Sequence, residues 1–296
     1  HDFGAIWASV RNKGKSIGAL SEDVIGSRTR ALFMIVIFLV LLMVNAVFGV
    51  VIAGLFVGTP SAVFPAWSAI VVALIIGQLI HRNFNLTVLS ILGVIALYAS
   101  IFIGSQLPVE LPDQVFGLAA NGSWIVLLFI YAAIASMLPV LVLLQPRDFI
   151  NGMQLFVGLI LLYGAVLLSL PDISAPAFNS QVAVDAPSLV PLLFVTIACG
   201  AVSGFHGIVS SGTTSKQIDK ETDSRFVGYL GAVGEGSLAL ITIVAVSGVA
   251  LAATPELWHE IYDQYGEAGA TTFVQGGAQL ISNGWGVPLG ISTTLL

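Results

Sequence analysis

Charged residues are scarce in this sequence. Only 9% of its 296 residues are Asp, Glu, Lys or Arg, whereas a soluble domain carries about 25%. Ten Lys and Arg side chains cannot cover the outside of a soluble protein of this size. They also form no basic patch, so we expect no nucleic-acid partner. Water is therefore excluded as the solvent for most of the surface.

Cysteine is almost absent, since Cys199 is the only one. An intrachain disulfide is excluded, and no cysteine spacing typical of zinc sites is present. Acidic residues alternate between positions 219 and 223, but basic residues are interleaved with them. This pattern is typical of a solvated loop rather than of a cation site. We expect no metal and no cofactor.

Long apolar stretches are abundant, and 57% of the residues are hydrophobic. A helix needs about 20 mostly apolar residues to cross roughly 30 Å of hydrocarbon. An eighth stretch begins near residue 276, and seven others meet or approach this length: 31–57, 67–80, 84–104, 123–144, 150–170, 189–211 and 226–253. The sequence predicts an all-α, polytopic transmembrane helix bundle of about seven or eight spans, with Pro139 kinking the fourth.

The bundle is predicted to occupy 31–296 as one domain. Residues 1–30 are too polar to span a membrane, and Ile17, Leu20 and Val24 follow a helical spacing within them. We expect a cytoplasmic segment here, with a short helix lying at the membrane interface.

Basic residues alternate between the connections. All ten lie in 1–30 or in the loops at 81–83, 145–149 and 212–225, and the intervening connections contain none. Because Lys and Arg are retained on the cytoplasmic side of short loops, these four segments are predicted to be cytoplasmic. The composition and the distribution of basic residues indicate a multi-pass protein in a lipid bilayer.

Glu235 is the only carboxylate placed inside a predicted span. Nine residues separate it from Phe226, which puts it about 14 Å deep. An ionisable group there costs about 2.5 kcal/mol or more, and such residues usually face a polar cavity or a partner. Two interpretations are open: a functional carboxylate, or one that only holds helices together. Nearby glycines allow a backbone or a ligand to approach closely: Gly228, Gly231, Gly234 and Gly236.

The segment 198–214 is the second candidate region. Its glycines and hydroxyls disfavour an unbroken helix, and a broken helix at membrane depth lines a cavity or is buried in protein. The alternative is a helix contact through small residues, since Gly200 and Gly204 form a GxxxG pattern. A lone histidine is typically packed and hydrogen-bonded, but His206 and Glu235 together could handle a proton. The other candidate binding residues are Gly200, Ser203, Gly204, Ser210, Ser211 and Thr213.

Several runs are similar to one family across nearly the whole chain. They are His1-Asp2-Phe3, Gly14-Lys15-Ser16-Ile17-Gly18, Val44-Asn45-Ala46-Val47-Phe48, the segments 197–206 and 210–217, and the segment 221–229 leading to Gly234-Glu235-Gly236. With these runs the sequence resembles the carbon starvation protein A family of bacterial inner-membrane proteins. The resemblance implies uptake of peptides or of pyruvate, and a helical fold with broken helices related to the amino acid, polyamine and organocation transporters. It also implies further spans upstream, so we expect this chain to be an internal piece, truncated at both ends.

Our leading hypothesis is a proton-coupled secondary transporter. Residues 198–214 would supply substrate-binding backbone, and Glu235 would take up and release the coupling proton. A starvation sensor or structural partner is a different class, which requires no carboxylate at the membrane midplane. An enzyme is not predicted, because one histidine and one glutamate supply little of a catalytic constellation.

Overall fold

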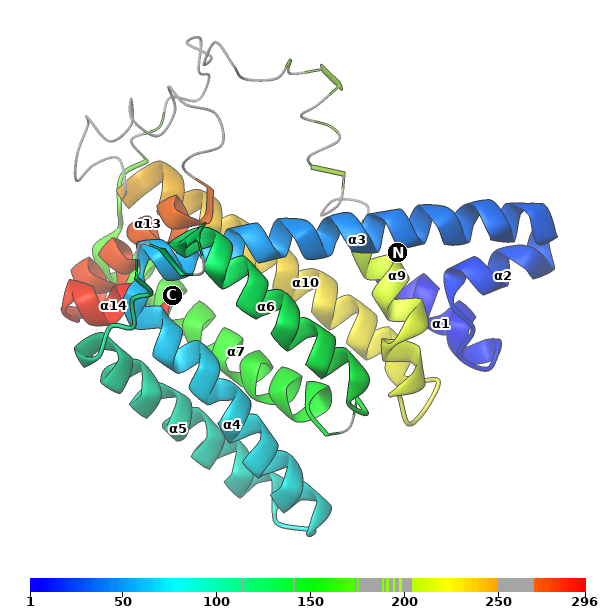
Figure 1. The fold of residues 1–296 in the computed structure, drawn as a ribbon, viewed down its shortest axis with the longest axis horizontal. Coiled ribbons are helices and arrows are strands. Elements are labelled where there is room, and N and C mark those ends of the chain that lie inside the picture. The colour runs from blue at the N-terminus through cyan, green and yellow to red at the C-terminus, as the bar shows by residue number, and fades with distance from the viewer. Residues whose placement is uncertain are drawn as a thin grey trace. The chain divides into compact units, whose positions relative to one another are not determined.

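Two compact helical units make up the chain in the computed structural model (Figure 1). Unit 1 comprises His1–Ala46 and Asp185–Leu240, and unit 2 comprises Val47–Val184 and Ile241–Leu296. Two of the three boundaries between them fall inside helices, α3 (Ser27–Gly58) and α10 (Asp223–Val244). The structure describes residues 1–112, 114–115, 117–140, 142–173, 175, 188, 190–191, 194, 197–198, 204–249 and 269–296.

Unit 1 is built from short helices around the first part of α3 and the first part of α10. The short elements are α1 (Asp2–Arg11), α2 (Ile17–Val24), α9 (Gly204–Gly212) and the 3-10 turn η3 (Thr214–Lys216). Helix α1 lies against α9 and η3, and α2 also contacts α9 (Figure 1). Helix α2 confirms the short helix predicted from residues 17–24, while its interfacial position stays a prediction.

Unit 2 holds the remaining helices and one small hairpin. The helical elements are η1 (Pro60–Ala62), α4 (Val63–His81), α5 (Leu86–Gln106), α6 (Ala120–Met137), α7 (Leu144–Ser169), the π-helical η4 (Ala245–Val249), α13 (Gly269–Trp285) and α14 (Leu289–Leu295). Strands β1 (Gln114–Val115) and β2 (Leu118–Ala119) pair antiparallel, with Gln114 opposite Ala119.

Six helical segments in the described part of the chain are long and apolar enough to cross a membrane. They are Ser27–Gly58, Pro60–Ile80, Leu86–Gln106, Ala120–Met137, Leu144–Ser169 and Asp223–Gly248. In the most apolar 18-residue stretch of α3, only 6% is buried inside the protein. The side chains of Leu32 and Phe38 are largely exposed. Such exposure of apolar side chains suits hydrocarbon rather than water. The prediction of an all-α polytopic bundle is confirmed.

Two further predicted spans are not among these six helical segments. The stretch 189–211 lies mostly outside the described residues, and only its last part is seen, in α9. The eighth stretch begins at Gly269, not near residue 276, and α13 is 17 residues long. A seventh and an eighth span therefore stay predictions.

The predicted kink at Pro139 is wrong. Helix α6 ends at Met137, and Leu138 is extended with φ −83° and ψ 147°. A proline disfavours the helical conformation in the residue before it, so the helix stops there instead of bending. The segment 145–149, predicted as a loop, forms the first turns of α7. Pro146 fits there because the first four N–H groups of a helix have no partner within the helix.

Small residues let the helices of unit 2 approach closely. A Cβ atom added to Gly104 would lie 2.6 Å from the carbonyl oxygen of Ser61, and one added to Gly284 would lie 2.6 Å from the Cα atom of Ala165. Without side chains at these points, α5 can pack against η1 and α13 against α7. A core cluster joins α4, α5 and α7 through Ala73, Ile76, Leu89, Leu97 and Ile150.

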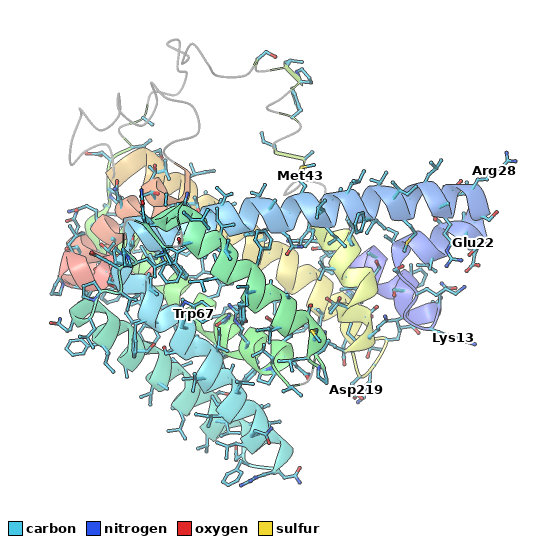
Figure 2. The ribbon with its side chains drawn as sticks, in the orientation of Figure 1. Lys13, Glu22, Arg28, Met43, Trp67 and Asp219 are labelled. Carbon is cyan, nitrogen blue, oxygen red and sulfur yellow. The ribbon has the colours of Figure 1, made fainter. Side chains whose placement is uncertain are left out.

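Charged side chains of unit 1 gather around the α1–α2 connection, the start of α3 and the turn before α10. Figure 2 labels Lys13, Glu22, Arg28 and Asp219 among them. Three ion pairs form here: Arg11 with Glu221 at 2.7 Å, Lys15 with Asp23 at 2.7 Å, and Arg30 with Glu22. All six side chains are more than a third exposed, so each pair contributes about 0–1 kcal/mol.

Candidate functional site

Two carboxylates and one imidazole meet where α1, α9 and α10 come together in unit 1. The Nδ1 atom of His206 lies 3.1 Å from Glu235 Oε2 and 3.5 Å from Asp2 Oδ2. Asp2 is the first residue of α1, His206 belongs to the first turn of α9, and Glu235 lies in α10. The structure thus brings together His206 and Glu235, the two residues that the sequence suggested as a proton-handling pair. It adds Asp2 to them.

The three side chains differ in their exposure. Asp2 is 10% exposed, whereas Glu235 is 37% and His206 is 42% exposed. The second carboxylate oxygen of Asp2, Oδ1, is buried and has no hydrogen-bond partner among the described residues. Removing a carboxylate oxygen from water without a partner costs free energy, so this atom marks a place where a proton or a ligand would be stabilising.

Asp2 was not among the residues singled out as candidate ligands. It lies in a polar segment, where a carboxylate needs no special explanation, and it is far along the chain from the other two members. The only sequence signal was its place in the His1-Asp2-Phe3 run. Contact with His206 depends on the folding of α1 across α9, which no local pattern reveals.

A close approach of α1 to α10 holds Asp2 near this cluster. A Cβ atom added to Gly228 would lie 2.6 Å from both the backbone N and the Cα atom of Phe3. The rings of Phe3 and Tyr229 stack with their centroids 5.7 Å apart. Gly228 and Glu235 are seven residues apart and so lie on the same face of α10. The glycine therefore permits the contact that places the neighbouring Asp2.

The family model of carbon starvation protein CstA matches residues 1–285. The chain belongs to this family. It is 33% identical over 82% of its length to the peptide transporter CstA of Campylobacter jejuni, and 33% identical over 83% to the pyruvate/proton symporter BtsT of Escherichia coli. It covers 36% and 35% of those two proteins, about a third of each. No solved structure matches the chain.

The other candidate binding residues predicted from the sequence fall into three groups. Gly200 and Ser203 lie outside the described residues. Gly204 begins α9 and lines a cavity, while Thr213 is exposed just after α9. The Ser210 hydroxyl donates to the carbonyl of His206, and the Ser211 hydroxyl donates to the carbonyl of Ile208 at 3.1 Å. Binding by any of these residues stays a prediction.

Residues 204–212 form one uninterrupted helix despite their three glycines. The break predicted within 198–214 therefore does not lie between Gly204 and Gly212. Serine hydroxyls that bond to carbonyls three or four residues earlier are compatible with a helix, and Ser210 and Ser211 both do so here. After Gly212 the chain continues into the 3-10 turn η3.

A cavity of about 510 Å³ opens beside the cluster, between α1, α2, α3 and α9. His1 and Gly207, the chain neighbours of Asp2 and His206, line it. Glycine and alanine on α1 and α9 leave its space open, and apolar side chains of α3 such as Phe33 and Val36 form another wall. This volume lies in the range of small-molecule sites, and the walls suit an apolar group.

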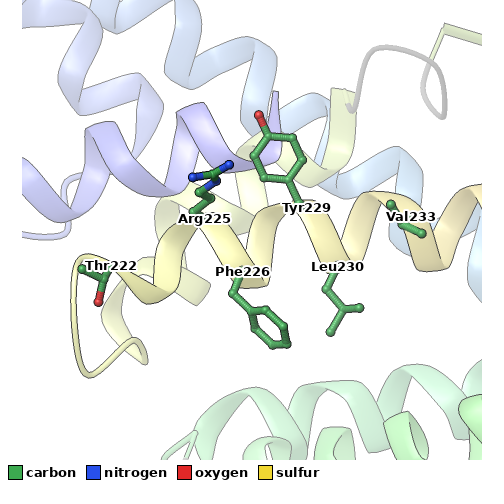
Figure 3. Close-up of a pocket in the computed structure, with 6 residues that line it drawn as sticks. All are labelled: Thr222, Arg225, Phe226, Tyr229, Leu230 and Val233. Atoms are coloured by element: carbon green, nitrogen blue, oxygen red, sulfur yellow. The ribbon is translucent and has the colours of Figure 1, made fainter.

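A second hollow of about 530 Å³ follows one stretch of α10 (Figure 3). Arg225 and Tyr229 project to one side of the helix in this view, and Phe226 and Leu230 project to the other. It combines one cation with apolar and aromatic side chains. Among the described residues, no group of three or more His, Cys, Asp or Glu side chains is arranged to hold a metal ion.

Three buried serines fix α1 to the end of α9. The Oγ atom of Ser9 lies 2.6 Å from the Ser211 carbonyl oxygen, 2.7 Å from the Lys15 carbonyl oxygen and 2.8 Å from Ser215 Oγ. Ser211 Oγ also accepts the backbone N–H of Ile17 at 3.0 Å. This serine cluster (Ser9, Ser211 and Ser215) connects the α1–α2 segment with α9 and η3, and so positions Asp2 relative to His206.

We expect Ser9→Ala to weaken the docking of α1. The substitution leaves buried polar partners without their hydroxyl, which costs about 1–3 kcal/mol. Local opening of α1 should then become roughly 5- to 150-fold more frequent. Hydrogen–deuterium exchange of the α1 amides in the full-length protein measures this. Ser105→Ala is the matched control, because Ser105 is only partly buried and its hydroxyl donates to the carbonyl of Phe102 in its own helix. Equal exchange in both variants would show that the serine cluster does not hold α1.

Proposed function

We propose that this chain forms the proton-handling part of a secondary transporter in the bacterial inner membrane, taking up a small organic solute together with protons. The observation that carries the proposal is the contact of the His206 imidazole with two carboxylates inside unit 1. Ionisable groups in a membrane bundle are costly, and they mark proton relays and ion pathways. The names of the relatives support it, since they are a peptide transporter and a pyruvate/proton symporter.

The function belongs to the whole protein, because the matched part of this chain covers only about a third of each relative. The cluster supplies the coupling site in this proposal, with Glu235 taking up and releasing the proton. Unit 1 would contribute substrate contacts through Gly204 and the cavity beside it. The basic residues of the 1–30, 81–83, 145–149 and 212–225 segments would face the cytoplasm. Asp2, at the start of the first segment, would reach from there to the cluster around Glu235.

The cavity favours peptides over pyruvate as the solute. Pyruvate has only six non-hydrogen atoms, whereas a cavity of about 510 Å³ accommodates a larger molecule. Its largely apolar lining suits the side chains of a short peptide with small or apolar residues. Asp2 lies next along the chain to the cavity residue His1, and its carboxylate would attract a cationic amino group.

Uptake by the full-length protein in proteoliposomes tests the proposal. An inward proton gradient should drive accumulation of labelled short apolar peptides, and a protonophore should abolish it. Labelled pyruvate in the same vesicles tests the substrate assignment, since pyruvate uptake without peptide uptake would contradict it. Counterflow without a gradient separates transport from sensing, structural and enzymatic roles. A protein that shows neither gradient-driven uptake nor counterflow of any tested solute would overturn the proposal.

A further inference from the structure

We propose that Asp2 is the inner proton-binding group of this site, and that His206 transfers a proton between Glu235 and Asp2. The inference rests on the proposed function, because it supplies the step after Glu235 has taken up the coupling proton. It assigns a role to a residue of the first helix that lies outside every predicted span.

Both carboxylates approach the same nitrogen of the imidazole. Glu235 Oε2 is 3.1 Å from Nδ1 and Asp2 Oδ2 is 3.5 Å from it. A single N–H on Nδ1 can serve only one acceptor well at a time. His206 therefore has two alternative partners, and in this conformation it lies nearer to Glu235.

Exposure gives the transfer a direction. Glu235 and His206 are each more than a third exposed, whereas the Asp2 side chain is nine-tenths buried. A proton that enters at Glu235 and passes through His206 to Asp2 therefore moves from an accessible group to a buried one. The unpartnered Oδ1 of Asp2 fits this role, because a protonated carboxyl group is much less costly to bury than an ionised one.

The transfer needs no other reactant. Neutral His206, in the tautomer that carries its own proton on Nε2, accepts the proton from Glu235 at Nδ1, so the O–H bond of the glutamic acid breaks and an N–H bond forms. The imidazolium then gives the same proton to Asp2 Oδ2, and that N–H bond breaks as the O–H bond of the aspartic acid forms. At the end Glu235 is ionised, His206 is neutral and Asp2 is protonated.

Six other charged side chains of unit 1 form ion pairs away from this cluster. The pairs are Arg11 with Glu221, Lys15 with Asp23 and Arg30 with Glu22. They involve α1, the α1–α2 connection, α2, the start of α3 and the turn before α10. On α10, Arg225 lines the separate hollow of Figure 3. His1, which precedes Asp2, lines the cavity and is the remaining titratable neighbour along the chain.

Asp2→Asn tests the inference in the full-length protein. The amide keeps the size of the side chain but cannot bind the proton, so net uptake driven by a pH gradient should fall about 100-fold or more. Solute counterflow, which needs no net proton release, should continue. Asp2→Glu should restore part of the uptake, and Asp23→Asn, an exposed control on α2, should leave it unchanged. Infrared difference spectra between two pH values should lose one protonated carboxyl band in Asp2→Asn.

The outcomes separate this inference from the proposed function. Normal proton-driven uptake by Asp2→Asn, together with its loss in Glu235→Gln, would overturn the role of Asp2 and leave the transporter proposal standing. Loss of both uptake and counterflow in Asp2→Asn without recovery in Asp2→Glu, or an unchanged infrared spectrum, would make Asp2 a structural residue. Normal uptake by both variants would reject proton handling by this cluster and leave only the transport activity of the protein standing.

Discussion

Glu235→Gln should stop proton-driven uptake by the full-length protein while leaving solute exchange intact. Glutamine has nearly the same shape, and its carbonyl oxygen can still accept from His206 Nδ1 at the 3.1 Å position of Glu235 Oε2. It cannot take up a proton, so the coupling step loses its entry group. We expect net uptake under a pH gradient to fall about 100- to 10,000-fold, the usual contribution of a positioned proton donor or acceptor. Initial uptake rates in proteoliposomes measure this.

The control for this variant is Glu22→Gln, the same chemical change at an exposed glutamate of α2 that pairs with Arg30. Its uptake should match that of the unchanged protein. Glu235→Asp should retain part of the coupled uptake, because a shorter carboxylate can still carry the proton. If Glu235→Gln takes up solute against a gradient as well as Glu22→Gln does, Glu235 holds helices together and does not couple protons.

The fold class could be predicted from the sequence because the membrane imposes one simple rule. A helix that crosses hydrocarbon needs a long apolar stretch. Each of the six candidate spans in the described structure overlaps one of the predicted stretches. Helix ends were less predictable. Pro139 and Pro146 look alike in sequence, yet the first follows the end of α6 and the second lies inside the first turn of α7. Which role a proline takes depends on where the preceding helix stops.

The candidate site was half predictable for a similar reason. Glu235 could be identified because a carboxylate in an apolar stretch is costly, and the cost itself is the signal. Asp2 gives no such signal in a polar segment, although it becomes nine-tenths buried once α1 packs on α9. Serine hydroxyls are ambiguous in the same way. Ser211 was predicted as a ligand, and in the structure its hydroxyl bonds Ile17 and Ile208. The roles of Asp2 and Ser211 both depend on burial by contacts between residues that are far apart in the chain.

Gly228→Leu should separate α1 from α10 and uncouple transport. A Cβ atom at residue 228 would lie 2.6 Å from two backbone atoms of Phe3, and a backbone cannot turn aside as a flexible side chain can. Overpacking of this kind costs about 1–3 kcal/mol or more. Helix α1 has to move, and Asp2 moves with it away from His206. Hydrogen–deuterium exchange should show faster exchange of the α1 amides, and proton-driven uptake should fall to the level of Asp2→Asn.

Gly231→Leu is the matched control, one turn further along α10, where nothing lies within 4 Å of an added Cβ atom. It should leave the exchange of α1 amides unchanged. The double variant Gly228→Leu with Asp2→Asn gives a stricter test, because two substitutions that act on one contact are not additive. If Gly228 acts by placing Asp2, the double variant should take up solute no more slowly than Asp2→Asn alone. An additive loss would mean that the α1–α10 contact supports transport by a route that does not pass through Asp2.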